Sequence, residues 1–181
     1  PMRTTADKDG GYSLVELIVV VVILGILGSL VAMIFANTWR TQTNVTDQTQ
    51  ATTRGQLIAS EIERAMRNGV AFEIEGGGTI LEINTSLDRD HQCQGFAFDA
   101  GQLRMTVGGW PATIPSTWPV WQDQVAQTGT TPYFVAKGSN GVTYSFDATA
   151  TDPTVAGTAP VHFGGDAFMR NAAEGTMAPC W

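Results

Sequence analysis

The stretch "GGYSLVELIVVVVILGILGS", residues 10–29, decides the fold, because it places a Gly-Gly pair and one carboxylate directly before a long apolar run. From Leu17 to Ala36 there is no charged residue, and fourteen of these twenty residues are Leu, Ile, Val or Phe. As a helix, twenty residues span about 30 Å, the thickness of the hydrocarbon layer of a membrane. Their insertion contributes about −6 kcal/mol, which outweighs a cost of about 3 kcal/mol for Glu16 at the end of the span. The sequence therefore predicts a membrane-inserted helix that carries a carboxylate near its start.

The apolar run differs from a secretory signal, in which a small-residue cleavage site follows the apolar region and the region is removed. Here the candidate site, Gly10-Gly11, precedes the run, and no A-x-A pattern follows Ala36. The sequence therefore predicts that the apolar segment is retained. A plain signal anchor is the alternative, but it explains neither the two glycines nor Glu16.

The segment Gly11–Leu17 followed by the apolar helix resembles the class III signal of type IV pilins and type II secretion pseudopilins. The resemblance covers about 30 of the 181 residues, and Arg3 and Lys8 fit the short polar leader of that family. It implies that a membrane peptidase cleaves after Gly11 of the Gly10-Gly11 pair and methylates the new amino terminus at Tyr12, where the family most often has Phe. Glu16 would then be the fifth residue of the mature chain. In the family, this glutamate meets the amino terminus of a neighbouring subunit and sets the register of assembly.

Gly25, Gly28 and Ser29 are small residues within the apolar run. Small residues allow close approach of helices in lipid, whereas glycine costs about 1 kcal/mol in a helix interior. The family resemblance implies that part of this helix can melt in the filament, commonly beside a proline. Met33 stands about where that proline would be, so we expect any melting at Gly25–Ser29.

After the apolar run, a Thr- and Gln-rich stretch (residues 41–53) leads to the segment "RGQLIASEIERAMRNG". Its apolar residues Leu57, Ile58, Ile62, Ala65 and Met66 fall mostly on one helical face, and its charged residues mostly on the other. Taken with the resemblance, this pattern predicts one long helix. The predicted parts are a cleaved leader (1–11), a transmembrane and filament-core segment (12–36), an amphipathic continuation (37–69) and a head domain (70–181).

The head domain reads as β-structure. Three pairs of alternating apolar and polar runs are joined by glycine-containing turns: "AFEIE-GGG-TILEI", "GFAFD-AG-QLRMTV" and "YFVAK-GSN-GVTYSF". Such patterns are typical of β-hairpins. The expected fold class is α+β, with a long N-terminal helix whose apolar half protrudes and whose second half packs against an antiparallel β-sheet.

Cys93 and Cys180 are the two cysteines of the chain. An even count in a domain outside the cytoplasm predicts a disulfide, and two separate buried thiols are the alternative.

Trp110, Trp118 and Trp121 lie in the proline-containing segment "GGWPATIPSTWPVWQDQ". They are candidates for a contact surface, but aromatic anchors that cover the sheet are the more common arrangement.

The sequence has no signature of a catalytic or metal site. His91 beside Cys93 resembles a metal pair, but His162 is the only other histidine. Asp147, Asp152 and Asp166 lack the spacing of a calcium-binding loop. The net charge of −7, with scattered cations, argues against a nucleic-acid surface. We therefore expect no enzyme activity, no cofactor and no bound metal.

The resemblance implies a structural role as a pilin, either major or minor, of a type IV pilus-like filament. The implied partners are other copies of the chain and other pilins, a prepilin peptidase, and an inner-membrane assembly platform with a separate ATPase. The implied location is the cytoplasmic membrane for the precursor and a cell-surface filament afterwards. A type II secretion minor pseudopilin and a single-pass membrane-anchored extracellular binding domain are the alternatives.

Overall fold

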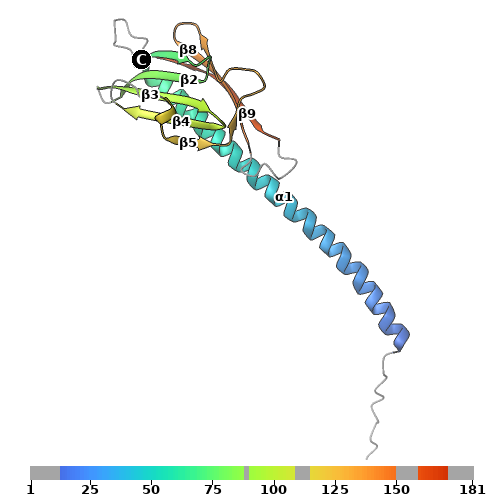
Figure 1. The fold of residues 1–181 in the computed structure, drawn as a ribbon. Coiled ribbons are helices and arrows are strands. Elements are labelled where there is room, and N and C mark those ends of the chain that lie inside the picture. Colours follow the sequence, from blue (N-terminus) through green and yellow to red (C-terminus); the bar gives the residue numbers. More distant parts are fainter. Residues whose placement is uncertain (1–12, 88–89, 109–114, 150–158, 171–181) are drawn as a thin grey trace, which may run out of the picture. The chain divides into compact units, whose positions relative to one another are not determined.

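The computed structural model describes residues 13–87, 90–108, 115–149 and 159–170 (Figure 1). Along the chain, α1 (Leu14–Asn68) is followed by strands β1 to β9, with one short 3-10 helix, Pro115–Thr117. The predicted α+β class, a long apolar N-terminal helix with an antiparallel head, is confirmed. Contacts divide the chain into two compact units, Pro1–Thr43 and Asn44–Trp181. Each unit is described by itself.

The second unit begins with the C-terminal part of α1, which buries one stripe of its surface. The stripe contains Ala51, Gly55, Ile58, Ile62 and the neighbouring pair Ala65 and Met66. This spacing of three and four residues follows the helical period, so the stripe faces one way along the helix. Leu57, which the sequence placed on this face, is 47% exposed, and that prediction is wrong.

Five strands form the first sheet, in the order β1-β2-β3-β4-β5. Every neighbouring pair is antiparallel. The strands are β1 (Gly69–Glu75), β2 (Ile80–Leu87), β3 (Asp90–Asp99), β4 (Gln102–Gly108) and β5 (Val120–Asp123). Each strand pairs with the next along the chain, so the sheet is a meander. The predicted β1–β2 and β3–β4 hairpins are confirmed.

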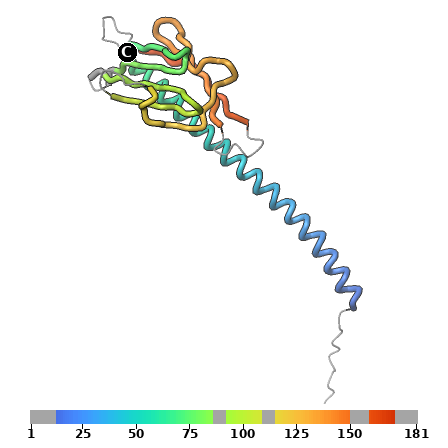
Figure 2. Tube along the Cα trace, in the orientation of Figure 1, coloured from blue at the N-terminus to red at the C-terminus, as the bar shows by residue number. Residues whose placement is uncertain are grey.

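The second sheet is built around β8 (Gly141–Ala148). Along one edge of β8, β7 (Phe134–Lys137) pairs with its first half and β6 (Val125–Ala126) with its last two residues. Along its whole length β8 also pairs with β9 (Val161–Phe168), a strand that the sequence did not predict. The β7–β8 hairpin is confirmed. Figure 2 follows the chain from the helix through the first sheet, green to yellow, and into the second, orange to red.

The core of the second unit lies where α1 meets both sheets. The helix contributes Ile58, Ile62, Ala65 and Met66, and both sheets contribute fully buried aromatic and aliphatic side chains. Two helix carboxylates tie the helix to the sheets at the margins of this core. Glu61 accepts a hydrogen bond of 2.9 Å from the Gln94 amide of β3, and Glu63 accepts one of 2.8 Å from the Tyr144 hydroxyl of β8.

Two glycines allow aromatic rings to approach the backbone closely. A Cβ atom at Gly55 of α1 would lie less than 3.0 Å from the Phe163 ring of β9, and one at Gly95 of β3 would collide in the same way with the Trp118 ring. A side chain at either position would displace the ring, so each glycine is required by packing rather than by backbone conformation.

Candidate functional site: the N-terminal assembly segment

The described part of α1 begins with a turn in which the Ser13 carbonyl accepts a hydrogen bond of 3.1 Å from the Leu17 amide. Serine is among the residues favoured at the N-cap position, where a helix begins. Glu16 lies in this first turn. A carboxylate there interacts favourably with the positive end of the helix dipole by about 0.3–1 kcal/mol. This local effect is small beside the cost of carrying the charge into an apolar environment.

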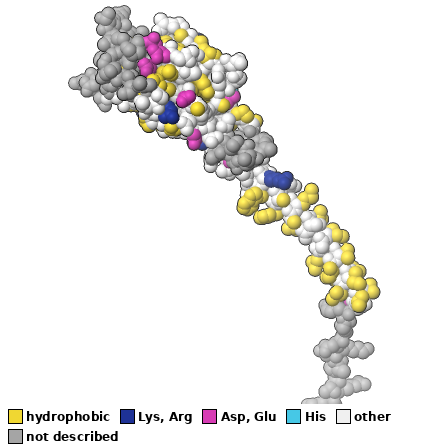
Figure 3. Space-filling model, viewed as in Figure 1, with side chains coloured by type: hydrophobic (Ala, Val, Ile, Leu, Met, Phe, Trp, Pro, Cys, Tyr) yellow, Lys and Arg dark blue, Asp and Glu magenta, His cyan; other side chains and the backbone are white. Residues whose placement is uncertain are grey.

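The apolar side chains of this segment have no cover within the described residues. From Leu14 to Phe35 every large apolar side chain is 47–75% exposed. The most apolar window of α1 has none of its residues buried, and α1 is long and apolar enough to cross a membrane. In Figure 3 apolar side chains cover most of the visible surface of this segment. An exposed apolar surface of this extent indicates contact with lipid or with other proteins.

Glu16 is the only charged residue between Leu14 and Trp39. Among the residues that the structure describes, it takes part in no ion pair. Once the segment is surrounded by lipid or by other apolar helices, this carboxylate needs a partner, because an isolated buried charge is strongly unfavourable. That partner must come from residues outside the described ranges or from another molecule.

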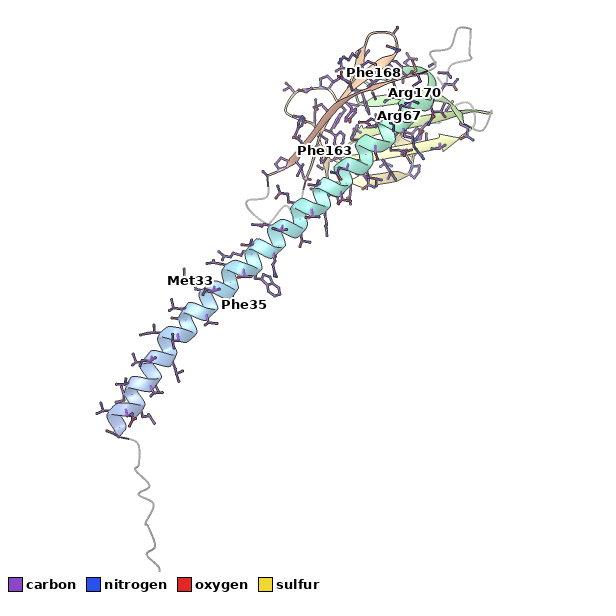
Figure 4. The ribbon with its side chains drawn as sticks, turned by 180° about the vertical axis from the view of Figure 1, so that it is seen from behind. Met33, Phe35, Arg67, Phe163, Phe168 and Arg170 are labelled. Atoms are coloured by element: carbon purple, nitrogen blue, oxygen red, sulfur yellow. The ribbon has the colours of Figure 1, made fainter. Side chains whose placement is uncertain are left out.

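The helix is unbroken through Gly25, Gly28 and Ser29. A Cβ atom at either glycine would meet nothing within 4 Å, and the Ser29 hydroxyl donates a hydrogen bond of 2.7 Å to the Ile26 carbonyl. Met33 and Phe35, labelled in Figure 4, are each 66% exposed. Helix melting at Gly25–Ser29 upon assembly stays a prediction for the assembled state.

Residues 7–32 match the family model described as the prokaryotic N-terminal methylation motif. The chain carries a class III prepilin signal. The match includes Gly10, Gly11, Tyr12 and Glu16, together with most of the apolar run, up to Ala32. Neither the comparison with curated proteins nor that with solved structures finds a match. The prepilin signal supports a type IV pilin-like or pseudopilin role, processing by a prepilin peptidase and a membrane-anchored precursor.

Gly10, Gly11 and Tyr12 of the prepilin signal lie outside the described residues, so cleavage after Gly11 and methylation at Tyr12 stay predictions. The same holds for the predicted disulfide. The Cys93 side chain is buried in β3, 4% exposed, whereas Cys180 lies outside the described residues.

Trp118 does not belong to the candidate contact surface, and it takes the anchor arrangement that was the preferred expectation. This side chain is 1% exposed and lies over Gly95, where it covers the first sheet. Trp118 is therefore an aromatic anchor, the more common arrangement named above. Trp121 is half-buried against the core, and Trp110 lies outside the described residues.

The side chains of Asp147 and Asp166 make hydrogen bonds and ion pairs with other side chains of the head. Asp147 accepts a hydrogen bond of 2.8 Å from Thr128 and lies 2.9 Å from Nδ1 of His162. Asp166 pairs with Lys137 and accepts a hydrogen bond of 2.6 Å from Thr143, and these contacts lower the pKa of its carboxyl group. Within the described parts of the chain, no group of three or more His, Cys, Asp or Glu side chains is arranged to hold a metal ion. Asp152 and the side chain of His91 are not described.

Proposed function

We propose that this chain is a structural subunit, a pilin, of a type IV pilus-like filament. In this proposal the precursor is cleaved after Gly11, methylated at Tyr12 and polymerised through the N-terminal part of α1. The prepilin peptidase and an ATP-driven assembly platform are separate proteins. The subunit passes from the cytoplasmic membrane into a filament at the cell surface and has no catalytic role.

One observation carries this proposal: a helix segment that is apolar on all sides, uncovered within the described chain, begins with a single carboxylate inside a prepilin signal. Lipid alone would cover the apolar side chains, but it offers no partner for the Glu16 carboxylate. Cleavage after Gly11 places an ammonium group at Tyr12, four residues before Glu16. In a bundle of such helices, the amino terminus of one subunit and Glu16 of a neighbour would neutralise each other.

The pairing would fix the axial register of neighbouring subunits. A bundle shifted along its axis would leave both charges buried and unpaired, at a cost of about 3–5 kcal/mol for each broken pair. At about 1.4 kcal/mol for each tenfold change, this corresponds to roughly a hundredfold to several thousandfold preference for the paired register. Glu16 thus contributes specificity of assembly more than stability of the subunit.

The test replaces Glu16 by Gln in the full chain in its native host, with Glu16→Asp as the matched variant that keeps the charge. We expect Glu16→Gln to insert into the membrane at the wild-type level and to yield little or no sheared filament. Glu16→Asp should retain more filament than Glu16→Gln. Normal filament yield from Glu16→Gln would refute the register role and favour a membrane anchor. Secreted enzymes stranded in the cell after deletion of the chain would favour the pseudopilin alternative.

A further inference from the structure

Several charged side chains among the described residues of the second unit form ion pairs with one another. Arg54 lies 3.5 Å from Asp123, Arg64 lies 2.8 Å from Glu61, and Lys137 pairs with Asp166. After these pairs are counted, two clusters of charge remain on different elements. One is the pair Arg67 and Arg170, which we call the arginine cleft. The other contains Glu73, Glu75 and Glu82 and is called the glutamate patch.

The arginine cleft lies between the last turn of α1 and the end of β9. Its volume is about 320 Å³, and Arg67 and Arg170 both line it, as Figure 4 shows from behind. Two carboxylates also line the cleft, but Glu63 already accepts the Tyr144 hydroxyl and Asp166 already pairs with Lys137. Within the described residues neither guanidinium group makes an ion pair. The cleft therefore presents two exposed cations that are suited to carboxylate ligands.

The glutamate patch lies on β1 and β2, on the face of the first sheet opposite the helix. Glu73 and Glu82 are direct cross-strand partners, and Glu75 follows Glu73 by two residues and so shares its face. Like charges directly opposite each other destabilise a sheet. The Glu82 side chain is only 6% exposed. Burial, and then Glu75 and Glu73, raise the pKa of its carboxyl group.

Protection of a sheet edge explains only part of this patch. Charged side chains on an edge strand block unwanted strand pairing, and β1 is the end strand of the first sheet. That role accounts for Glu73 and Glu75. It does not require Glu82, which lies on the second strand and is buried opposite Glu73. The third carboxylate adds negative potential behind the half-buried Glu73 and the exposed Glu75, as expected for a surface that receives cations.

We propose that, in the filament, the arginine cleft of one subunit binds the Glu73 and Glu75 carboxylates of a neighbouring copy of this chain. This contact rests on the proposed function. The two surfaces are different parts of one molecule, so each copy can offer its arginine cleft to one neighbour and its glutamate patch to another. Repeated in this head-to-tail way without closure into a ring, the contact produces an open helical polymer. Copies that each carry a net charge of −7 repel one another, so locally complementary surfaces favour their close packing.

The test is a charge swap in the full chain, expressed in the native host. One variant carries Arg67→Glu with Arg170→Glu, a second carries Glu73→Arg with Glu75→Arg, and a third carries all four changes. Asp99→Arg is a matched control with the same type of charge reversal on an exposed residue outside the two clusters. The readouts are sheared filament, membrane-bound subunit and the methylated Tyr12 peptide.

We expect each paired reversal to lower sheared filament on the order of tenfold, because like charges would then face each other across the interface. The four-change variant should recover filament, and the Asp99→Arg control should differ little from wild type. As a second measurement, cells that express Arg170→Cys and Glu75→Cys chains together should form a cross-linked dimer in sheared filaments. Normal filaments from both paired reversals would overturn the proposed contact but leave the pilin role standing. The same conclusion would follow if the four-change variant did not recover filament and no cross-linked dimer formed. If the wild-type chain itself formed no filament, both the proposed contact and the proposed pilin role would be overturned.

Discussion

The packing of the Phe163 ring on Gly55 predicts an unusual response to a Gly→Ala substitution. In the interior of a helix, alanine is normally more favourable than glycine by about 1 kcal/mol. At position 55 the added methyl group would lie less than 3.0 Å from three atoms of the Phe163 ring. That ring is stacked on the fully buried Phe146, with centroids 5.5 Å apart and planes at 16°, so it cannot turn aside freely.

The size of the effect follows from the contacts that the ring would lose. Displacement of Phe163 removes an aromatic pair worth about 0.5–1.5 kcal/mol and part of a burial worth about 1.5–3 kcal/mol. Against these losses stands the gain of about 1 kcal/mol in helix propensity. We therefore expect Gly55→Ala to lower the free energy of unfolding of the head by about 1–3 kcal/mol, the usual range for an overpacked core.

The assay is urea unfolding of the detergent-solubilised full chain, followed by tryptophan fluorescence, in which the buried Trp118 reports on the head. The control is the same substitution in a Phe163→Ala background, where the ring is absent. There Gly55→Ala should stabilise the head by about 1 kcal/mol, so the two substitutions should be strongly coupled. A stabilising effect of Gly55→Ala in the wild-type background would refute this account of the packing.

Two further predictions concern the first sheet. The raised pKa of Glu82 means that its folded-state carboxyl group holds a proton more tightly than in the unfolded chain, so this stability is complete below about pH 4.5 and is lost as the pH rises through the folded-state pKa. Glu82→Gln should therefore gain stability relative to wild type as the pH rises above about 4.5 in chemical unfolding, and a pH-independent difference would contradict this expectation. If Cys93 and Cys180 form a disulfide, thiol alkylation of the denatured, unreduced chain should label neither residue. Reduction of the disulfide should then lower the free energy of unfolding by about 4–5 kcal/mol, whereas labelling of both thiols before reduction would contradict the pairing.

The sequence predicted the elements whose signals are local. The three hairpins were found because glycines mark their turns, and Gly76, Gly101 and Gly138 adopt positive φ angles of 58°, 80° and 69° in the structure. The apolar segment was equally clear, since no local pattern competes with a long uncharged run. Glu16 also stood out, because a carboxylate at that position conflicts with the surrounding hydrophobicity.

Features that depend on distant partners were not predicted. Strand β9 was missed because Gly164 and Gly165 interrupt its alternation, and the need for Gly165 becomes visible only beside Tyr144, whose hydroxyl lies 2.6 Å from where its Cβ would be. The anchor role of Trp118 depends on Gly95, which is far from it in the sequence. Likewise, the helical pattern placed Glu61 and Glu63 on the polar face. Their hydrogen bonds to the two sheets could not be predicted without knowledge of which strands flank the helix.

The central claim is that the chain is a processed filament subunit. It is tested most directly by mass spectrometry of the amino-terminal peptide, on surface material sheared from the native host and on its membranes. We expect a peptide that begins at methylated Tyr12 in the sheared fraction. An intact leader through Gly11 in both fractions, with the prepilin peptidase present, would contradict the claim and leave a simple membrane anchor.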